Sequence, residues 1–425
     1  MTNVEVKVAE VISVGSELLL GDILNSNGQY LAQELAKLGI AHYYQTTVGD
    51  NPERLQQAIE LAASRANLLI FTGGLGPTPD DLTTETIANT FQTALVERAE
   101  VWNDIQAKFA QRGRTLTDNN RKQALLPEGA DILKNPVGTA PGMIWSPQPH
   151  LLILTFPGVP SEMKRMWQDI AVPLLKAQGW SADVIASRIL RFWGVSESAL
   201  AEKVSHLFEQ ANPTVAPYSN WGEVKLRISA KAPTTDAAMA LIAPMEAEIR
   251  DIAGIDCFGA DAQSLGTAVG ALLQQRQETL AVAESCTGGG LGSYLTEIPG
   301  SSQYFHGGVI AYDNSVKQSL LDVSAADLAQ LGAVSEAVAK QMAQGVRDRL
   351  GTTWGLSITG VAGPDGGTPD KPVGCVYIGV AGPVNVMAKR YQFGARGRDW
   401  VRRVSVCSAL DQLRRACITT PFHLD

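Results

Sequence analysis

The sequence contains few cysteines and no long apolar run. Its five cysteines are scattered and no two of them have CxxC spacing, so neither a zinc site nor a disulfide framework is indicated. No apolar run approaches the length of a membrane span, and the first residues carry an acid instead of a basic segment followed by an apolar one. We therefore expect a cytoplasmic protein without a membrane partner.

Positive charge is also scarce. The 35 Lys and Arg residues are outnumbered by 43 Asp and Glu residues, which leaves a net charge of −8. Nucleic-acid phosphates are held mainly by clustered Lys and Arg, so this balance argues against a nucleic-acid partner. A small anionic ligand needs only one or two cations and some backbone N–H groups, and the composition is compatible with such a ligand.

The first 170 residues alternate strand and helix patterns. Apolar runs predict strands at 8–14, 41–48 and 68–71, with one helix between them that ends at Gly39 and another that begins at Asn51. This order predicts a parallel sheet covered on both faces. Such a sheet binds ligands beyond the carboxyl ends of its strands.

The rest of the chain divides into two further regions. Residues 175–255 contain two strand patterns and two helix patterns without a cluster of chemically suggestive residues, which predicts a small α+β domain. From about Ser264 strand and helix patterns alternate again. The elements expected there are 279–283, 308–312, 336–350, 354–358, 373–380 and 398–417. Because the chain is too long for one ordinary core, we predict two parallel or mixed-sheet α/β domains joined by a small α+β domain, with boundaries at 1–172, 173–256 and 257–425.

Ser285 is the first candidate for catalysis. It follows a predicted strand and precedes Cys286, Thr287 and the glycines 288–290, so nearby N–H groups are unobstructed. A nucleophilic serine needs a general base, an oxyanion hole and a backbone that exposes its hydroxyl. A helix is expected to begin there, and its positive end would help to hold a phosphate or an oxyanion. The alternative is that Ser285 only caps this helix, and spacing alone favours the alternative.

Lys317 is the candidate base for Ser285. A lysine serves as a base when a dry pocket lowers its pKa. Lys317 lies just after a predicted strand that ends at Tyr312, which could relay a proton or hold the ammonium group. The alternative, favoured by the local sequence alone, is a solvated helix lysine beside a core tyrosine. Of five histidines only His306 is nearby in the sequence, and Cys286 is a rival nucleophile without an evident histidine partner.

Two further segments belong to the same region. A loop from Thr359 to Gly367 follows a predicted strand and is rich enough in glycine to approach a ligand closely. Arg398 could clamp a phosphate through two hydrogen bonds, although an arginine near a helix start is more often exposed to solvent. Neither segment assigns a function by itself.

The N-terminal region has a second candidate site in two polar glycine loops, 15–22 and 72–81. The second loop, TGGLGPTPDD, ends with the adjacent carboxylates Asp80 and Asp81. Glycine amides suit phosphate oxygens, and the two acids could hold a divalent cation that bridges a pyrophosphate. The alternative is a loop followed by an acidic helix start, and the residues alone do not decide between the two.

Five strings of the C-terminal region, AESCTGG, GGVIAYDNSVK, LGAVSEAVA, SITGVAGPDGG and KPVGCVYI, occur in one specific order and spacing. In this they resemble the C-terminal domain of the CinA family, the competence/damage-inducible proteins. The resemblance implies deamidation of nicotinamide mononucleotide to nicotinic acid mononucleotide and ammonia, without a cofactor. It implies these roles: a nucleophile at Ser285, a Tyr–Lys pair at Tyr312 and Lys317, an assisting hydroxyl at Thr359 and a phosphate contact at Arg398. The substrate site is expected to include Cys286, Thr287, Gly288, Gly289 and Gly360, with amides near Cys286–Gly288 holding the oxyanion.

The N-terminal region carries a second resemblance. The loop TGGLGPTPDD, with VGSELLLG and PGVPSEM, resembles the MoaB/MogA molybdopterin-binding fold, and together with NPVGTAPG it is similar to the N-terminal domain of the CinA family. This implies a metal-dependent ADP-ribose pyrophosphatase that yields AMP and ribose 5-phosphate. A transition metal or magnesium is expected at Asp81 first, with Asp80 as a further ligand. The expected substrate contacts are Gly15, Ser16, Asn25, Asn27, Thr72, Gly73, Gly74, Gly76 and Glu162.

Together the two implied activities describe a pyridine-nucleotide salvage enzyme, in which one domain clears ADP-ribose and the other recycles nicotinamide mononucleotide. The middle region resembles a small KH-type domain but has no clear GxxG loop with flanking basic residues, so RNA binding is not expected. Family analogy favours a homodimer. Two other hypotheses stay open: a non-catalytic adaptor in competence or recombination, and a molybdopterin-binding protein.

Overall fold

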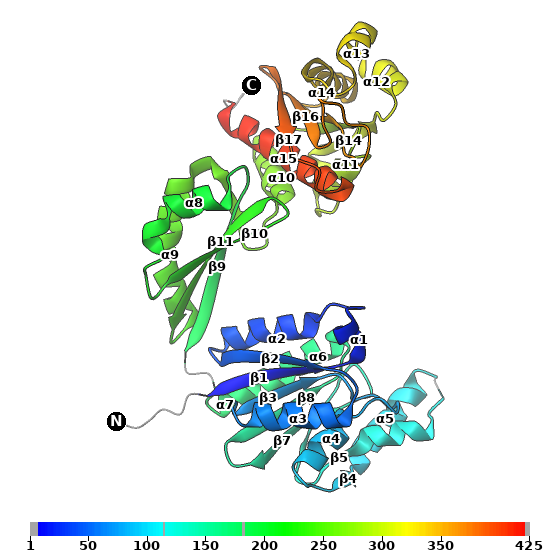
Figure 1. Ribbon diagram of the computed structural model, residues 1–425, viewed down its shortest axis with the longest axis vertical. Coiled ribbons are helices and arrows are strands. Elements are labelled where there is room, and N and C mark those ends of the chain that lie inside the picture. The colour runs from blue at the N-terminus through cyan, green and yellow to red at the C-terminus, as the bar shows by residue number, and fades with distance from the viewer. Residues whose placement is uncertain (1–6, 114, 181–182, 421–425) are drawn as a thin grey trace. The chain divides into compact units, whose positions relative to one another are not determined.

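The chain forms two compact units in the computed structural model (Figure 1). The first unit comprises residues 1–186 together with 230–240, and the second comprises 187–229 together with 241–425. The structure describes residues 7–113, 115–180 and 183–420. Among these described residues, no helix combines the length and the apolar character needed to cross a membrane.

The first unit is built on a six-stranded sheet of order β2-β1-β3-β8-β7-β6. The strands are β1 (Val8–Val14), β2 (Ala41–Val48), β3 (Leu68–Thr72), β6 (Asp131–Leu133), β7 (Gly142–Gln148) and β8 (Leu151–Phe156). Strands β2, β1, β3 and β8 are parallel, whereas β7 is antiparallel to both of its neighbours, β8 and β6. All residues of β3 and β8 are buried, as their continuous apolar sequences require.

Helices cover both faces of this sheet (Figure 1). Alternate residues of β1 enter different cores, with Ala9 and Val11 in one and Ile12 and Val14 in the other. The first core also receives α2 (Ser26–Lys37), α6 (Pro160–Met166), a π-helical turn (Trp167–Ala171) and α7 (Val172–Ala177), and the second receives α3 (Pro52–Ala63) and α4 (Thr83–Thr90). The other elements are α1 (Ser16–Leu20), β4 (Leu95–Glu97), α5 (Ala99–Gln111), a 3-10 helix (Asp118–Ala124) and β5 (Leu125–Pro127).

The second unit contains most of a four-stranded sheet of order β10-β11-β9-β12. Its elements are β9 (Val184–Phe192), α8 (Glu197–Lys203), a 3-10 turn (Ser205–Leu207), β10 (Thr214–Asn220), β11 (Glu223–Ala232), α9 (Thr235–Ala253), a 3-10 turn (Gly254–Asp256) and β12 (Cys257–Ala260). Strands β10 and β11 form an antiparallel hairpin in which Asn220 pairs with Glu223. The two turn residues, Trp221 and Gly222, have φ angles of 52° and 80°, as a two-residue turn of this kind requires.

The C-terminal part of the second unit has a five-stranded sheet of order β14-β13-β15-β16-β17. Its strands are β13 (Leu280–Glu284), β14 (Phe305–Ile310), β15 (Trp354–Gly360), β16 (Cys375–Ala381) and β17 (Val386–Gln392). Strand β13 is parallel to both β14 and β15, and β16 and β17 continue the sheet antiparallel. The carboxyl ends of β13, β14 and β15 therefore meet at one edge of the sheet.

Two cores cover the faces of this sheet. Leu280 and Val282 of β13 pack in the core that contains α10 (Leu265–Arg276), α11 (Gly290–Thr296) and α15 (Arg398–Thr419). Ala281 and Ala283 pack in the core that contains α12 (Asn314–Leu321), α13 (Ala325–Leu331) and α14 (Glu336–Leu350). A short 3-10 turn, Ser301–Gln303, precedes β14.

The predicted fold class is confirmed, with differences at the sheet edges. The parallel order expected for the N-terminal sheet holds for four strands, while β6 and β7 add an antiparallel edge. Strand β14 ends at Ile310, so Tyr312 lies beyond the strand and not at its end. Strand β17 was not predicted, because most of its residues are exposed or half-buried and its sequence lacks an apolar run. The exact domain boundaries stay a prediction.

Candidate functional site

The C-terminal site forms where β13 ends between β14 and β15. Glu284, the last residue of β13, pairs with Ile310 on one side and with Ile358 on the other. The Ser285 amide donates to the Ile358 carbonyl at 2.9 Å, and the Ala311 amide donates to the Glu284 carbonyl at 2.7 Å. The sheet itself thus brings the candidate nucleophile next to the segments that carry Lys317 and Thr359.

The buried Glu284 side chain organises the loop after Ser285. Its carboxylate accepts hydrogen bonds from the amides of Gly289 at 3.1 Å, Leu291 at 2.9 Å and Gly292 at 2.8 Å. The N-cap of α11 is Gly289, so the expectation that Ser285 caps this helix is wrong. The expectation that the positive end of the helix holds a phosphate or an oxyanion is also wrong, because Glu284 already occupies it. Sequence reasoning missed Glu284, since an acid before a serine gives no signal of such a fold-back.

Ser285 is 9% exposed, and among the described residues its hydroxyl has no hydrogen-bond partner. The Gly288 amide donates to the Ser285 carbonyl at 3.1 Å, which closes a tight turn around the residue. The amides of Cys286 and Thr287 make no backbone hydrogen bond to any residue that the structure describes. They are the donors left to stabilise an oxyanion next to Ser285.

Lys317 on α12 is buried, with 1% of its surface exposed. The expectation of a solvated helix lysine is therefore wrong. Its Nζ donates to the carbonyls of Ala311 at 2.8 Å and Tyr312 at 3.0 Å. Burial lowers the pKa of Lys317, and the nearby Asp313 carboxylate and Cys286 thiol oppose this shift. A neutral amine has two N–H groups and one lone pair, so two carbonyl partners satisfy both donors and leave the lone pair for a proton.

Cys286 is a poor nucleophile in this setting. Burial raises the pKa of its thiol to about 12, against the weaker opposing effect of Arg398 and Arg402. Because the thiolate is the reactive species, almost none of it is present near neutral pH. The structure therefore favours Ser285 over its neighbour.

The other predicted residues of this site surround its entrance or support it. Tyr312 is 63% exposed, and Arg398, also exposed, donates to its hydroxyl at 3.5 Å and to the Gly363 carbonyl at 2.9 Å. Thr359 is buried and donates to the Ala333 carbonyl at 2.8 Å. Arg402, which sequence reasoning missed, donates to the Thr287 carbonyl at 2.8 Å and so tethers the loop after Ser285.

The first unit has a cavity of about 500 Å³ at the carboxyl ends of its parallel strands. Nearly all residues predicted for this site line it: Gly15, Asn25, Asn27, Thr72, Gly73, Gly74, Gly76, Asp80, Asp81 and Glu162. Ser16 does not line the cavity, because its hydroxyl and amide are paired with the amide and carboxylate of Asp50. Sequence reasoning missed the lining residues Glu17, Asp50, Gln123 and Thr139. The Gly49-Asp50 pair that follows β2 is the signal that could have found Asp50.

The two acids of the loop after β3, Asp80 and Asp81, differ in how they are held. Asp81 accepts hydrogen bonds from the Thr78 amide at 2.8 Å and from the Thr78 hydroxyl, and a side chain at position 76 would collide with its carboxylate. Asp80 is fully exposed, and a hydrogen bond from Thr78, with Lys122 nearby, lowers its pKa. Both acids line the cavity, and one oxygen of Asp81 is committed to the loop.

Two amides and one acid, Asn27, Asn25 and Glu162, also line the cavity. Asn27 donates to the Thr72 hydroxyl at 2.9 Å and to the Gly158 carbonyl at 2.8 Å, while its buried Oδ1 has no partner among the described residues. Asn25 caps α2 through the Gly28 amide and donates to Ser13, so its role is structural. Glu162 accepts from Asn135 at 2.7 Å.

The acids of the cavity fit only one kind of metal site. Among the residues that the structure describes, no three His, Cys, Asp or Glu side chains are grouped to enclose an ion. A transition metal held entirely by protein ligands does not fit this set. Magnesium is commonly held by one or two carboxylates plus substrate phosphates, and Asp80 and Asp81 fit that arrangement.

Three family sequence models match consecutive parts of the chain. The probable molybdopterin binding domain matches residues 10–177, the damage-inducible protein CinA KH domain matches 187–259, and the CinA C-terminal domain matches 262–417. These matches define a class of three-domain proteins that combine a MoaB/MogA-like domain, a KH domain and a CinA domain. Whole-chain relatives then identify the family.

The CinA-like protein of Synechococcus elongatus is 67% identical over 411 residues, which are 96% of this chain and 98% of the relative. The CinA-like protein of Trichormus variabilis is 65% identical over 413 residues, 97% of this chain and 99% of the relative. The chain belongs to the CinA family. A solved structure of the competence/damage inducible protein CihA from Agrobacterium tumefaciens is 35% identical, covers 36% of this chain and 94% of its own, and has a TM-score of 0.36.

Replacing Glu284 by glutamine tests how the loop after Ser285 is held. Glutamine has one carbonyl oxygen where the carboxylate has two, and its NH₂ group would face at least one of the three amides that now donate. Leaving a buried donor unsatisfied costs about 1–3 kcal/mol. We expect Glu284→Gln to lower the free energy of unfolding by that amount in urea. The exposed Glu297→Gln, at the end of the same helix, is the control and should stay within about 0.5 kcal/mol of wild type; equal effects would contradict this role.

Proposed function

We propose that the C-terminal domain is a serine amidohydrolase that converts nicotinamide mononucleotide to nicotinic acid mononucleotide and ammonia. The observation that carries the proposal is that the sheet places an uncommitted Ser285 at the end of β13, next to the segment after β14 that carries the buried Lys317, whose Nζ donates to two carbonyls. An adaptor would have no need of a desolvated lysine on a segment that adjoins a free serine. The substrate identity comes from the CinA resemblance, because the site geometry supports an amide hydrolysis but says nothing of the nicotinamide ring.

The proposed reaction begins with proton transfer from Ser285 to neutral Lys317. The Ser285 oxygen attacks the carboxamide carbon, and the amides of Cys286 and Thr287 stabilise the resulting oxyanion. When the tetrahedral intermediate collapses, the C–N bond breaks and the proton on Lys317 passes to the departing nitrogen, which leaves as ammonia. The carboxamide carbon is then held as an ester of Ser285.

Water completes the cycle. Lys317 takes a proton from water as the hydroxide adds to the ester carbon, and the returning proton lets the Ser285 oxygen leave. The products are the free carboxylate and the regenerated serine, so one water is consumed and one ammonia released. Arg398 is exposed and keeps N–H groups beyond those given to Gly363 and Tyr312, which suits a phosphate at the entrance.

For the N-terminal domain we propose hydrolysis of ADP-ribose to AMP and ribose 5-phosphate. The cavity of about 500 Å³ combines the glycine loop at residues 73–76 with carboxylates on its rim, which supports a pyrophosphate ligand. A divalent ion held by Asp80 and Asp81 would neutralise phosphate charge when bound. The unpartnered Oδ1 of Asn27 can accept a hydrogen bond from a ligand hydroxyl. The two domains together would form a pyridine-nucleotide salvage enzyme in the cytoplasm, and a homodimer stays the expected assembly.

The alternative for the N-terminal domain is molybdopterin binding, which the matched family description supports. Both ligands carry phosphate and would use the same glycine loop. Turnover of ADP-ribose separates the two, because a carrier of molybdopterin has no reason to hydrolyse it. A non-catalytic adaptor would hydrolyse neither ADP-ribose nor nicotinamide mononucleotide.

Loss of the Ser285 hydroxyl should abolish deamidation. In ammonia-release assays on nicotinamide mononucleotide with EDTA present, we expect Ser285→Ala to lower kcat by at least about 10³-fold, because removing the nucleophile of a Ser hydrolase costs that much or more. Cys286→Ala is the matched control at the neighbouring position and should keep most of the activity. Equal release from wild type and Ser285→Ala would move the nucleophile elsewhere, and no release from wild type would overturn the deamidase proposal.

The pH dependence of kcat/KM for deamidation should reflect the protonation of Lys317. The base must be neutral, so kcat/KM falls as the pH drops through the lowered pKa of Lys317. Asp313 raises that pKa, so Asp313→Asn should lower it further and move the acid limb to lower pH. Asparagine can still cap α12 through the Ser315 amide as Asp313 does. Asp322→Asn, at the other end of α12, is the control, and identical limbs in Asp313→Asn and wild type would contradict Lys317 as the base.

The acids of the N-terminal cavity should be needed only for the second activity. We expect Asp81→Asn to lower magnesium-dependent hydrolysis of ADP-ribose by about 10²-fold, the effect of losing one strong electrostatic contact to the reacting phosphates. The same variant should deamidate nicotinamide mononucleotide normally, and Ser285→Ala should hydrolyse ADP-ribose normally. Hydrolysis that persists in EDTA and in Asp81→Asn would show that the assignment of these acids is wrong.

A further inference from the structure

The KH domain contacts the C-terminal domain through Trp221, at the tip of the β10–β11 hairpin. The Trp221 ring stacks on Trp400, with centroids 5.6 Å apart and an interplanar angle of 24°. The Arg403 guanidinium lies 5.1 Å from the Trp221 ring centroid. Small polar residues and glycine are usual in such turns, and a bulky residue at a φ of 52° is uncommon. The packing of the ring, and not turn preference, therefore accounts for a tryptophan at this position.

Trp400 and Arg403 lie in the first two turns of α15, which also carry two arginines of the candidate site. Arg398 contacts Gly363 and Tyr312 at the entrance, and Arg402 holds the Thr287 carbonyl. The helix starts after Gly397 without a side-chain cap. Its start therefore depends on contacts made by its own side chains, and Trp221 provides one of them.

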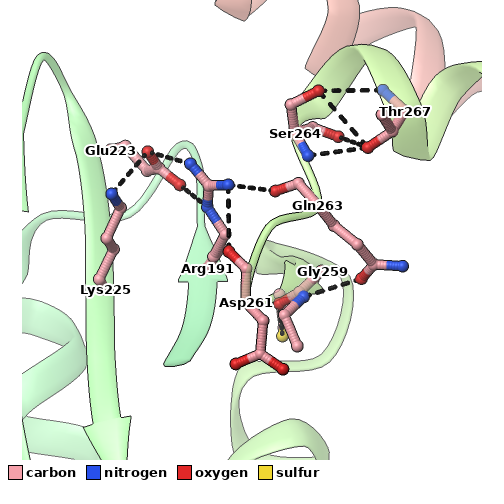
Figure 2. A network of polar contacts seen from close by, with 10 residues as sticks. Arg191, Glu223, Lys225, Gly259, Asp261, Gln263, Ser264 and Thr267 are labelled. Carbon is pink, nitrogen blue, oxygen red and sulfur yellow. Dashed lines mark hydrogen bonds and ion pairs between the residues drawn. The ribbon is translucent and has the colours of Figure 1, made fainter. Parts of the chain in front are cut away.

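The same end of the hairpin, next to the Trp221–Gly222 turn, is anchored by a polar network, shown in Figure 2. Arg191 on β9 forms a two-point ion pair with Glu223 at the start of β11, including an Nη2–Oε2 distance of 2.9 Å. The same guanidinium donates to the backbone carbonyls of Asp261 and Gln263, just before α10 begins. Arg191 and Glu223 are 17% and 14% exposed, so solvent and salt weaken this pair less than a surface pair.

A second set of contacts ties the KH domain to the far end of α15. Arg415 donates to the Trp193 carbonyl at 3.0 Å and pairs with Asp256 at 2.8 Å. The Trp193 indole donates to the Ser408 hydroxyl at 3.3 Å. The KH domain therefore holds α15 at both its start and its end.

From these contacts we propose that the KH domain is a positioning element of the C-terminal site, in which Trp221 braces the start of α15 and so holds Arg398 and Arg402 in place. Trp221 touches neither the substrate nor the reacting atoms, and it acts through these two arginines. The proposal gives the KH domain a partner inside its own chain. The expected effect of Trp221 on turnover rests on the proposed deamidation. The contact between Trp221 and the start of α15 does not depend on that proposal.

The test uses full-length protein and compares wild type with Trp221→Ala, Trp221→Phe and Tyr218→Ala. Tyr218 is the matched control, because Lys225 and Arg227 of the same hairpin contact its ring. Hydrogen–deuterium exchange of peptides covering 286–292 and 397–404 reports the brace directly. We expect faster exchange in both peptides for Trp221→Ala, exchange close to wild type for Trp221→Phe, and no change for Tyr218→Ala.

Kinetics with nicotinamide mononucleotide give the second readout. For Trp221→Ala we expect KM to rise about 5-fold, the scale of one lost aromatic contact, with a smaller change in kcat, because Arg398 is the expected phosphate contact. Unchanged exchange in Trp221→Ala would overturn the proposal. Faster exchange throughout residues 262–417 with lowered stability in urea would also overturn it, since Trp221 would then be only structural. If wild type releases no ammonia, the deamidase proposal fails and the exchange data alone decide on the brace.

Discussion

The buried carboxylate of Glu284 is the constraint on which the C-terminal site depends. It draws the amides of Gly289, Leu291 and Gly292 back over the end of β13. A chain can turn back this sharply only where positive φ angles are tolerated, and Gly288 and Gly289 have φ of 57° and 94°. The run of glycines is therefore needed for the fold-back over an acid. The Glu284 carboxylate accepts the hydrogen bonds of the amides at the start of α11. The hydroxyl of Ser285, which lies between Glu284 and α11 in the sequence, is therefore not used to cap the helix.

The two candidate sites occupy the same kind of position in their sheets but differ in chemical character. Each places its candidate site where parallel strands end, because backbone groups and loops converge there. In the first unit the loop after β3 leaves a wide cavity with exposed acids, which suits a large charged ligand. In the second, the loop after β13 closes tightly and a lysine is taken out of water. Burying an ammonium is costly, so the pKa of Lys317 is lowered from its usual value, although Asp313 opposes the shift.

The sequence predicted the elements whose signals are local. Strands β3 and β8 are buried on both faces, and β3 reads as a continuous apolar run. The polar glycine loop after β3 and the serine after β13 were found because each follows such a run. The resemblance to one family supplied the order of the domains, which no local pattern contains.

What the sequence did not reveal depends on contacts between distant segments. Lys317 lies in the stretch NSVKQSLL, and its burial follows from the packing of α12 against α14, with Nζ bonded to the carbonyls of Ala311 and Tyr312 that precede the helix. In the sequence nothing distinguishes Glu284 from a solvent-exposed acid, because its role depends on the folded conformation of the loop after it. Arg402 reaches Thr287 across 115 positions of sequence. The stacking of Trp221 on Trp400 joins two domains whose sequences, taken separately, give no sign of it.

The high pKa of the Cys286 thiol affects how readily this residue is oxidised. Peroxides and disulfides attack thiolates, and a thiol with a pKa of about 12 offers them almost none. We therefore expect Cys286, next to Ser285, to be oxidised only slowly although it carries sulfur. If the proposed serine–lysine deamidase is correct, its activity should be less sensitive to peroxide than that of an enzyme with a cysteine nucleophile.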